Sequence, residues 1–405
     1  MFDVEKIRRD FPILSDTVYG RPLVYLDSGA TAQKPACVIS RVEELMAHAN
    51  ANVHRGVHRL SEQMTEEYEN ARERVRAFVG ARSREEIVFT SGATASINAV
   101  AYAWSRRFLH RGDNIVVSEM EHHSNIVPWQ LAAEMCGAEI RVLPFDDDGR
   151  LMSERLGDLL DERTRMVAVT QASNTLGTRP DLRTVIDAAH AAGAAVMVDG
   201  CQGIVHGGVD VAQLGCDFYV FSGHKLYAPT GIGVLYGRRE LLQEMPPFMG
   251  GGDMVDKVTF ERTTYAPLPL KFEAGTSNFI GAVALGEAIA YLSQFDAAEV
   301  EAHEHALLSY ATESLMRIDG LRIYGTTPDK CSIISFNVDG VHNYDMGMIL
   351  DKLGIAVRTG HHCAEPVMTH YGVGGMCRAS LAMYNTREEI DVLGAGIARA
   401  VKMLR

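Results

Sequence analysis

One lysine of this sequence stands where a lysine can do chemistry. Lys225 ends residues 221–225, Phe-Ser-Gly-His-Lys, which come at the close of an apolar run, and Asp199 closes an earlier apolar run. Either residue alone could be an ordinary boundary residue, because strand ends in α/β folds are usually polar. Together they meet the needs of a pyridoxal 5′-phosphate (PLP) enzyme, in which a lysine forms a Schiff base and a carboxylate keeps the ring nitrogen protonated. The pair therefore predicts PLP chemistry.

A hydroxyl-rich turn could hold the phosphate of such a cofactor. Residues 90–94, Thr-Ser-Gly-Ala-Thr, follow an apolar run and precede a helical pattern. Backbone N–H groups at a helix start, a Ser or Thr hydroxyl and an unobstructed glycine together form an anion cup. An N-cap in a tight turn is the simpler alternative. The chain has no Gly-x-Gly-x-x-Gly and no Walker motif, so the phosphate need not belong to a nucleotide.

Two histidine pairs are candidates for ligand contact. Residues 121–125, Glu-His-His-Ser-Asn, follow another apolar run, and the flat ring of His122 could stack on an aromatic cofactor. A metal site is the alternative, but adjacent histidines at a strand end point in different directions and no Asp or Cys shows ligand spacing. His54 and His58 form an i,i+4 pair that could bind a metal, line a polar active-site loop or lie on an ordinary surface. We predict no metal site.

A polar loop in the last third of the chain carries a candidate nucleophile. Cys363 lies beside two histidines and near Arg358, and cationic neighbours raise the thiolate fraction that makes a cysteine reactive. A packing cysteine and a zinc ligand are the alternatives, and the polarity of the loop argues against packing. Further on, Arg378 interrupts an apolar strand pattern. A buried arginine needs a carboxylate partner, either from the protein or from an amino-acid substrate held bidentately.

Composition limits the functions open to this chain. Its 405 residues are 47% hydrophobic and 22% charged, enough for a sizeable core, and the net charge is −13. That charge disfavours nucleic-acid binding, which depends on clustered Lys and Arg. The first ten residues are charged rather than apolar and no run is long enough to span a bilayer, so we predict neither a signal peptide nor a membrane segment. Seven cysteines without a Cys-x-x-Cys pair favour a reducing, cytoplasmic setting.

Alternating apolar runs and helical segments must position these residues. Six short apolar runs, near residues 87, 115, 140, 167, 196 and 218, are separated by helical patterns, one of which is closed by Gly193. Repeated strand–helix units predict an α/β fold with a mostly parallel sheet covered on both faces, and ligands then bind at the carboxyl ends of the strands. A seventh run, residues 231–236, follows Lys225 too closely for a helical crossover, so we expect it to pair antiparallel.

The remaining patterns divide the chain into two domains. Glycines at 250–252 begin a stretch that we expect to be flexible to about residue 275, before a long helix with Leu285 and Ile289 on one stripe. Residues 332–338 read as a half-buried strand, and a helical stripe covers residues 390–404. We predict a large domain over residues 20–290 and a smaller α+β domain from residues 1–19 and 291–405, which carries the Cys363 loop.

Over nearly its whole length the chain resembles a group II (SUF-type) cysteine desulfurase, of the aminotransferase class V, fold-type-I PLP family. The resemblance is carried by residues 26–28 (Leu-Asp-Ser), 52–56 (Asn-Val-His-Arg-Gly), 121–123 (Glu-His-His), 199–202 (Asp-Gly-Cys-Gln), 222–225 (Ser-Gly-His-Lys), 273–276 (Glu-Ala-Gly-Thr), 358–363 (Arg-Thr-Gly-His-His-Cys) and 377–380 (Cys-Arg-Ala-Ser). The stretch Arg-Thr-Gly-His-His-Cys-Ala-x-Pro, residues 358–366, is highly specific for group II.

The resemblance implies a role for each matching residue. Lys225 would carry PLP and shuttle the substrate Cα proton, Asp199 would pair with the pyridinium nitrogen, and Cys363 would take the sulfur. His122 would stack on the ring and act in acid/base steps. The other cofactor contacts would be Gln202 at the ring hydroxyl, with Ala93, Thr94, Ser222, His224 and, from the other subunit of a homodimer, Thr276 at the phosphate. The substrate contacts would be Arg378, Asn174, Arg358, His54, Arg55 and Ala30.

The implied reaction is that of a sulfurtransferase: L-cysteine gives L-alanine and a Cys363 persulfide, which passes to an acceptor protein for iron–sulfur cluster assembly. Selenocysteine lyase activity is expected on the same scaffold, and His342 matches a place where the family contacts a zinc scaffold-like acceptor. Gln171 and Ala93 depart from the family pattern, which commonly has His and Thr there. The alternatives are another class V PLP lyase or epimerase that does not use Cys363, and a non-catalytic assembly protein.

Overall fold

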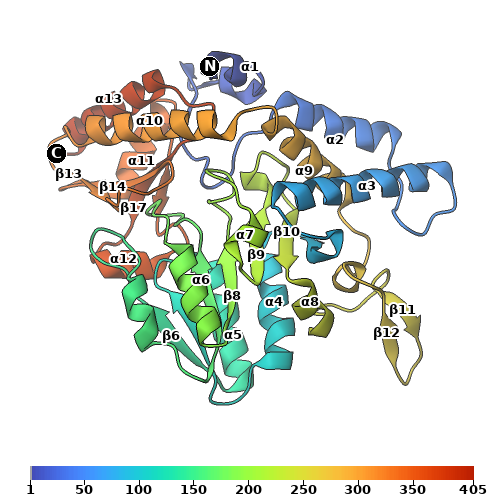
Figure 1. Ribbon diagram of the computed structural model, residues 1–405. Helices are drawn as coiled ribbons and strands as arrows, with labels where there is room; N and C mark the ends of the chain where they lie inside the picture. Colours follow the sequence, from blue (N-terminus) through green and yellow to red (C-terminus); the bar gives the residue numbers. More distant parts are fainter. Residues whose placement is uncertain (1) are drawn as a thin grey trace.

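The computed structural model describes residues 2–405, and a large seven-stranded sheet lies at its centre (Figure 1). The strands are β4 (Ile87–Thr90), β5 (Asn114–Ser118), β6 (Glu139–Leu143), β7 (Thr164–Thr170), β8 (Ala195–Asp199), β9 (Phe218–Ser222) and β10 (Gly233–Gly237). Their order is β4-β10-β9-β8-β7-β5-β6, and the pairs from β9 to β6 are all parallel. The predicted mostly parallel α/β sheet is confirmed.

β10 is the antiparallel exception that the sequence predicts. It pairs antiparallel with both β9 and β4. Only residues 226–232 connect it to Lys225, and a parallel crossover needs about a dozen residues or more. The short return therefore leaves Lys225 in a tight connection at the end of β9.

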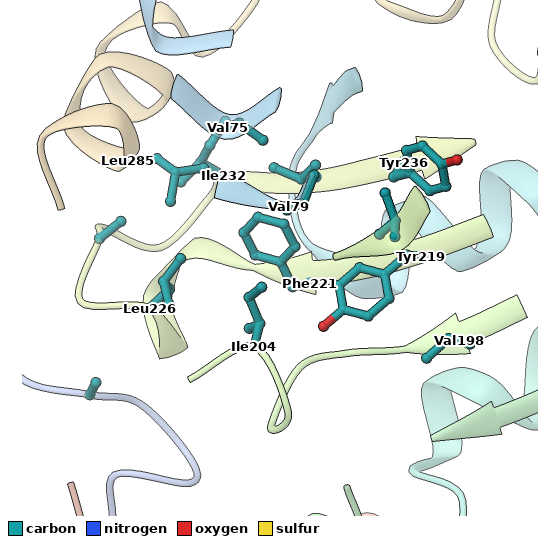
Figure 2. Close-up of a cluster of buried hydrophobic side chains, with 14 of the residues drawn as sticks. Val75, Val79, Val198, Ile204, Tyr219, Phe221, Leu226, Ile232, Tyr236 and Leu285 are labelled. Carbon is teal, nitrogen blue, oxygen red and sulfur yellow. The ribbon is translucent and has the colours of Figure 1, made fainter. Parts of the chain in front are cut away.

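Helices bury both faces of this sheet. The surrounding helices are α2 (Ala36–His48), α3 (Arg59–Phe78), α4 (Ala93–Phe108), α5 (Val127–Cys136), α6 (Leu182–Ala191), α7 (Val211–Leu214), α8 (Arg239–Glu244) and α9 (Phe279–Leu292). Alternate residues of β8 enter two different buried clusters: Val196 and Val198 enter one, and Met197 the other. Figure 2 shows the first cluster, which gathers side chains of β8, β9, α3 and α9. Burial on both faces explains why the strands read as continuous apolar runs.

A smaller sheet of antiparallel strands lies toward the end of the chain. Its strands are β13 (Leu321–Tyr324), β14 (Ile333–Val338), β17 (Met376–Ser380) and β16 (Arg358–Gly360), in that spatial order. Its helices are α10 (Ala297–Leu315), α11 (Asn343–Lys352), α12 (Glu365–Tyr371) and α13 (Arg387–Leu404). α10 and α13 lie side by side, and the N-terminal α1 (Val4–Arg9) lies beside them (Figure 1), where Arg8 pairs with Glu389 at 3.0 Å. The domain boundaries drawn from the sequence stay a prediction.

The stretch after Gly252 is more ordered than the sequence predicts. β11 (Val255–Val258) and β12 (Thr263–Tyr265) form an antiparallel hairpin that projects from the body (Figure 1). Its strands are short and largely exposed, so they lack the apolar alternation that marks a strand in sequence. None of the described helices is both long and apolar enough to cross a membrane.

A buried ion pair fixes the segment that leads from this hairpin into α9. Arg72 of α3 donates to both oxygens of Glu273, at 2.6 and 2.9 Å, and neither side chain is more than 3% exposed. Glu273 also accepts the Tyr68 hydroxyl at 2.8 Å and the Phe89 N–H at 2.7 Å. Every contact to the carboxylate comes from α3 or β4, so Glu273 ties the segment that carries Thr276 to the sheet.

We expect Glu273→Ala to destabilise the protein strongly. Removing one partner of a buried pair leaves the other charge uncompensated, which costs about 3–5 kcal/mol. Urea denaturation measures this as a large fall in the unfolding midpoint. Glu154→Ala is the matched control, because Glu154 pairs with Arg150 at 3.0 Å on the surface and its loss should change the midpoint little. Equal midpoints for the two variants would contradict this account of Glu273.

Candidate active site

Most of the predicted site residues line one cleft at the carboxyl ends of β8 and β9. Asp199 is the last residue of β8, Ser222 is the last of β9, and Lys225 ends the short helix η5 (Gly223–Lys225) that follows. The cleft has a volume of about 520 Å³. Its lining residues are Gly29, Ala30, Ala93, Thr94, His122, His123, Ser124, Asn174, Asp199, Cys201, Ser222, His224, Lys225, Arg358, Thr359, His361, His362, Cys363 and Arg378.

Local packing places Asp199 and Lys225. Asp199 is 4% exposed and accepts the Cys201 N–H at 2.9 Å. The chain turns directly after it at Gly200, where a Cβ would overlap the ring of Tyr219. The carbonyl preceding Lys225, that of His224, accepts the Ala32 backbone N–H at 3.1 Å and the Lys34 side-chain Nζ at 3.0 Å. Both functional residues therefore sit on tightly held backbone.

A helix start and a hydroxyl form one end of the cleft. α4 begins at Ala93, whose N–H donates to the Ser222 hydroxyl at 2.9 Å, and Thr94 follows on the cleft wall. The N-cap is Gly92, at φ 153°, in a region that favours glycine. Burial lowers the pKa of His224 to about 4, so its ring is neutral at pH 7. A helix start and hydroxyls are groups that can bind an anion, and the phosphate role of these residues stays a prediction.

His122 presents a neutral ring to the cleft. Its Nδ1 accepts the Ser124 N–H at 3.1 Å and lies 2.7 Å from the Ser124 hydroxyl, which assigns the ring proton to Nε2. Burial, followed by the charge of Lys225, lowers the pKa of His122 to about 4. The neutral ring can therefore stack on a planar group and donate a hydrogen bond from Nε2.

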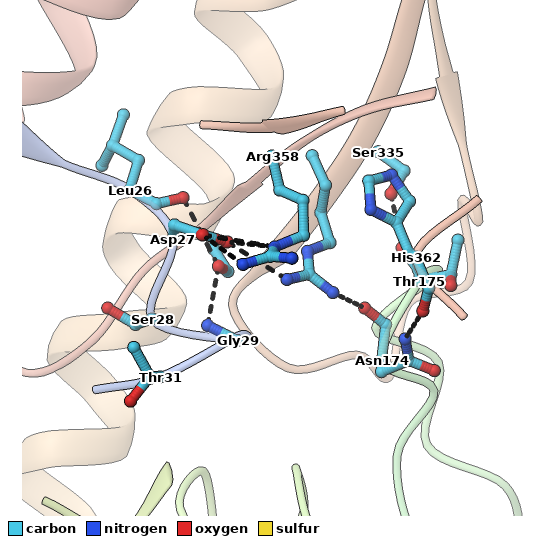
Figure 3. A network of polar contacts seen from close by, with 12 residues as sticks. Leu26, Asp27, Ser28, Gly29, Thr31, Asn174, Thr175, Ser335, Arg358 and His362 are labelled. Carbon is cyan, nitrogen blue, oxygen red and sulfur yellow. Dashed lines mark hydrogen bonds and ion pairs between the residues drawn. The ribbon is translucent and has the colours of Figure 1, made fainter. Parts of the chain in front are cut away.

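Two arginines form the opposite end of the cleft. Arg358 of β16 and Arg378 of β17 are cross-strand partners, and Figure 3 shows Arg358 beside Asp27. Arg378 also donates to the Asn174 carbonyl at 2.8 Å. The sequence predicts a carboxylate partner for Arg378 from the protein or from a substrate; within the chain, Asp27 is that partner, at 3.3 Å.

The Cys363 loop is held by hydrogen bonds from two sides. Its carbonyl accepts the His123 N–H at 2.7 Å, and the ring Nε2 of His123 accepts the Glu365 N–H at 3.0 Å. The carbonyl of His362 accepts the Asn174 side-chain amide at 2.7 Å. His362 and Cys363 both adopt left-handed backbone, with φ of 52° and 55°. The turn exposes the Cys363 side chain at the cleft.

Four predicted ligand contacts do not line this cleft within residues 2–405. Gln202 donates its amide to the Gly29 carbonyl at 2.8 Å, and Thr276 lies outside the lining. His54 pairs with Glu69 at 3.1 Å, and Arg55 pairs with Asp253 at 2.7 Å. Their ligand roles stay predictions. His58 caps α3 by accepting the Ser61 N–H, and no cluster of the described residues is arranged to hold a metal ion.

The structure also shows what the sequence reasoning missed. His123 holds the Cys363 loop, and Asp27 pairs with Arg358 and Arg378. Both residues lie in segments that the sequence singles out, but the sequence predicts neither of these contacts. The departure at Gln171 does not face the cleft, because its side chain contacts the Tyr219 hydroxyl and the Gly208 carbonyl. Ala93, the other departure, does line the cleft, and its backbone N–H donates to the Ser222 hydroxyl.

Comparison with known proteins agrees with this geometry. Residues 24–393 match the model of the family described as Aminotransferase class-V. The chain belongs to this family. It is 52% identical over 404 residues to a cysteine desulfurase of Pectobacterium carotovorum, covering 100% of this chain and 99% of that one. A cysteine desulfurase of Escherichia coli K12 is 51% identical over 405 residues, with both chains covered in full.

Solved structures share the fold over the whole chain. The crystal structure of the cysteine desulfurase CsdA from Escherichia coli superposes with a TM-score of 0.93 at 41% identity, and both chains are covered in full. The apo structure of a cysteine desulfurase from Thermococcus onnurineus also gives 0.93, at 37% identity, over 99% of this chain and 98% of that one.

The class-V cofactor is PLP, and the cleft residues fit it. Lys225 offers an amine, Asp199 a buried carboxylate, and the α4 start with Ser222 an anion cup, all lining one cavity. His122 adds a flat neutral ring. These are the four contacts that a phosphorylated pyridine aldehyde requires.

Proposed function

We propose that the protein is a cysteine desulfurase. One observation carries this proposal: among the seven cysteines, all within the described residues, only Cys363 is exposed, and it lines the same cleft as Lys225. A PLP lyase or epimerase of another kind has no need of a thiol at that place. The names of the similar proteins support the same reading.

Each side chain of the cleft has a distinct task in this reaction. Arg378 and Asn174 orient the carboxylate of L-cysteine, so that its Cα faces the Lys225 amine, which takes and returns the proton. PLP, when bound, supplies the electron sink for the carbanion formed at Cα. The Cys363 thiolate bonds to the substrate sulfur, the Cβ–S bond breaks, and its electron pair is protonated at Cβ. L-Alanine and a Cys363 persulfide result.

The finer assignment follows from the segment 358–366 and rests on its resemblance to group II. The protein is a SUF-type desulfurase that passes the persulfide to an acceptor for iron–sulfur cluster assembly and also acts on selenocysteine. It works as a homodimer, in which Thr276 of one subunit reaches the phosphate in the other. The position of Thr276 outside the cleft of its own chain supports that arrangement.

Product analysis tests this function. The protein, loaded with PLP, is supplied with L-cysteine and a reductant, and L-alanine and sulfide are measured together. Equal amounts of the two products support a desulfurase. L-Selenocysteine in place of L-cysteine tests the lyase activity, and ammonia with pyruvate, instead of alanine, would reject the proposal.

We expect His342→Asn to abolish stimulation by a zinc-binding sulfur acceptor, with basal turnover retained. His342 is exposed and caps α11, where its Nδ1 accepts the Tyr344 N–H at 3.3 Å. Nε2 is therefore the ring nitrogen that would bind a zinc ion. Asparagine preserves the cap and removes that nitrogen. His305→Ala, at an exposed histidine of α10, is the control. Unchanged stimulation in the Asn variant would reject the contact.

A further inference from the structure

The turn that carries Cys363 has a backbone conformation that needs support. His362 and Cys363 both have positive φ, 52° and 55°. Residues with a Cβ rarely adopt this left-handed conformation, and they keep it only where surrounding contacts hold them in place. The Cys363 side chain is exposed at the cleft, so packing of that side chain does not supply the support.

His123 contacts the turn both at the nucleophile and beyond it. It is the first residue of the short helix η3 (His123–Asn125). Its backbone N–H donates to the Cys363 carbonyl at 2.7 Å, and its ring Nε2 accepts the Glu365 N–H at 3.0 Å. The two hydrogen bonds enclose residues 363–365, so one residue holds the backbone of the turn at two points.

The His123 ring also completes the start of α12. The first N–H groups of a helix lack intrahelical partners, and a side chain at the N-cap usually accepts from one of them. The N-cap of α12 is Ala364, whose methyl group cannot accept a hydrogen bond, and Glu365 is the first helical residue. His123 therefore supplies, from a distant segment, the acceptor that the N-cap residue lacks.

The two neighbouring histidines have separate partners. The His122 ring is held by Ser124, whose N–H donates to its Nδ1 at 3.1 Å. The His123 ring is held by the turn instead. Because Nε2 of His123 accepts a hydrogen bond, the neutral ring carries its proton on Nδ1. A change in the His123 ring should therefore act on the Cys363 turn and leave the His122 ring in place.

We propose that His123 is a positioning residue for Cys363: its ring holds the turn so that the thiol meets the substrate sulfur. Placement matters for the rate, because moving a reacting group by about 1 Å can cost about 10²-fold. Loss of the ring contact should slow sulfur transfer and leave the binding of cofactor and L-cysteine unchanged. This inference rests on the proposed function, which gives Cys363 the task of bonding the substrate sulfur.

Two amide substitutions at position 123 form a matched pair. The Oε1 atom of glutamine lies about as far from the backbone as Nε2 of histidine, whereas Oδ1 of asparagine reaches only to the position of Nδ1. Both side chains are neutral, and both offer a carbonyl acceptor. His123→Gln can therefore accept the Glu365 N–H, and His123→Asn cannot.

Hydrogen exchange, resolved to single amides in the PLP-loaded proteins, measures the hold on the turn directly. The Glu365 amide should exchange about tenfold faster in His123→Asn than in the wild type, and His123→Gln should stay near the wild type. Single-turnover formation of L-alanine from L-cysteine should fall by about tenfold or more in His123→Asn, and His123→Gln should recover most of that loss. The absorption of the bound cofactor and the affinity for L-cysteine should stay unchanged in both.

Several results would overturn the inference. Equal turnover in the two variants would do so, even with unequal exchange, because the hydrogen bond would then have a structural role alone. A changed cofactor absorption in His123→Asn would mean that His123 serves the cofactor instead.

The wild type decides if neither variant folds. Its Glu365 amide should be protected from exchange, since the first amide of a helix has no intrahelical partner and His123 is its acceptor. Free exchange of that amide would contradict the inference. Failure of the wild type to form L-alanine rejects the proposed function instead, and the exchange result still shows whether His123 holds the turn.

Discussion

Lys225→Ala is expected to reduce L-alanine formation from L-cysteine by about 10⁴-fold or more, since the residue both bonds the cofactor and moves the Cα proton. Lys225 is the only lysine among the residues that line the cleft of the described chain. The measurement is single-turnover alanine formation with PLP present in excess.

A matched control separates this effect from general damage. Lys330 is another poorly exposed lysine, whose Nζ donates to the Gly325 carbonyl at 2.6 Å, and neither residue lines the cleft. Lys330→Met should keep alanine formation within a few fold. Borohydride reduction adds a second readout, because it should fix the cofactor to the wild type and not to Lys225→Ala. A Lys225 variant that still forms alanine at the wild-type rate would contradict the account.

Cys363→Ala is expected to reduce L-alanine formation by about 10²-fold or more, because the reaction then has no nucleophile for the substrate sulfur. The absorption of the bound cofactor should stay as in the wild type, since Cys363 belongs to the loop before α12 and not to the sheet that carries Lys225. Alanine and sulfide, measured together, give the size of the loss.

Another cysteine serves as the control for this variant. Cys136 lies at the end of α5, half-buried and outside the cleft, so Cys136→Ala should keep its turnover. Undiminished turnover in Cys363→Ala would mean that the thiol loop is incidental. The protein would then be a class V lyase or epimerase, the alternative that does not need Cys363.

Much of the fold follows from local pattern. The strands β4, β5, β7, β8 and β9 are almost entirely buried, so each leaves a short apolar run, and the helices between the strands keep a regular stripe. The brief connection after Lys225 determines that β10 must return antiparallel. The sequence does not predict the hairpin β11–β12, because its strands are largely exposed and therefore show no alternation of apolar and polar residues.

Sequence patterns likewise predict some of the site residues and not others. Asp199 and Lys225 are predictable because Asp199 ends β8 and Lys225 follows directly after β9, and parallel strands bring their carboxyl ends together. Asp27 is different: its contacts with Arg358 and Arg378 span 331 and 351 residues of sequence. The link from His123 to the Cys363 loop spans 242 residues. No local pattern records such pairings, which arise only when the small sheet packs against the large one.

Peptide mass spectrometry shows whether the substrate sulfur moves to Cys363. The PLP-loaded protein is mixed with one equivalent of L-cysteine without reductant, quenched and digested. We expect the mass of one extra sulfur atom on the peptide that contains Cys363, with an equal amount of L-alanine. Alanine formed with no sulfur on that peptide, or with the sulfur on another cysteine, would contradict the account.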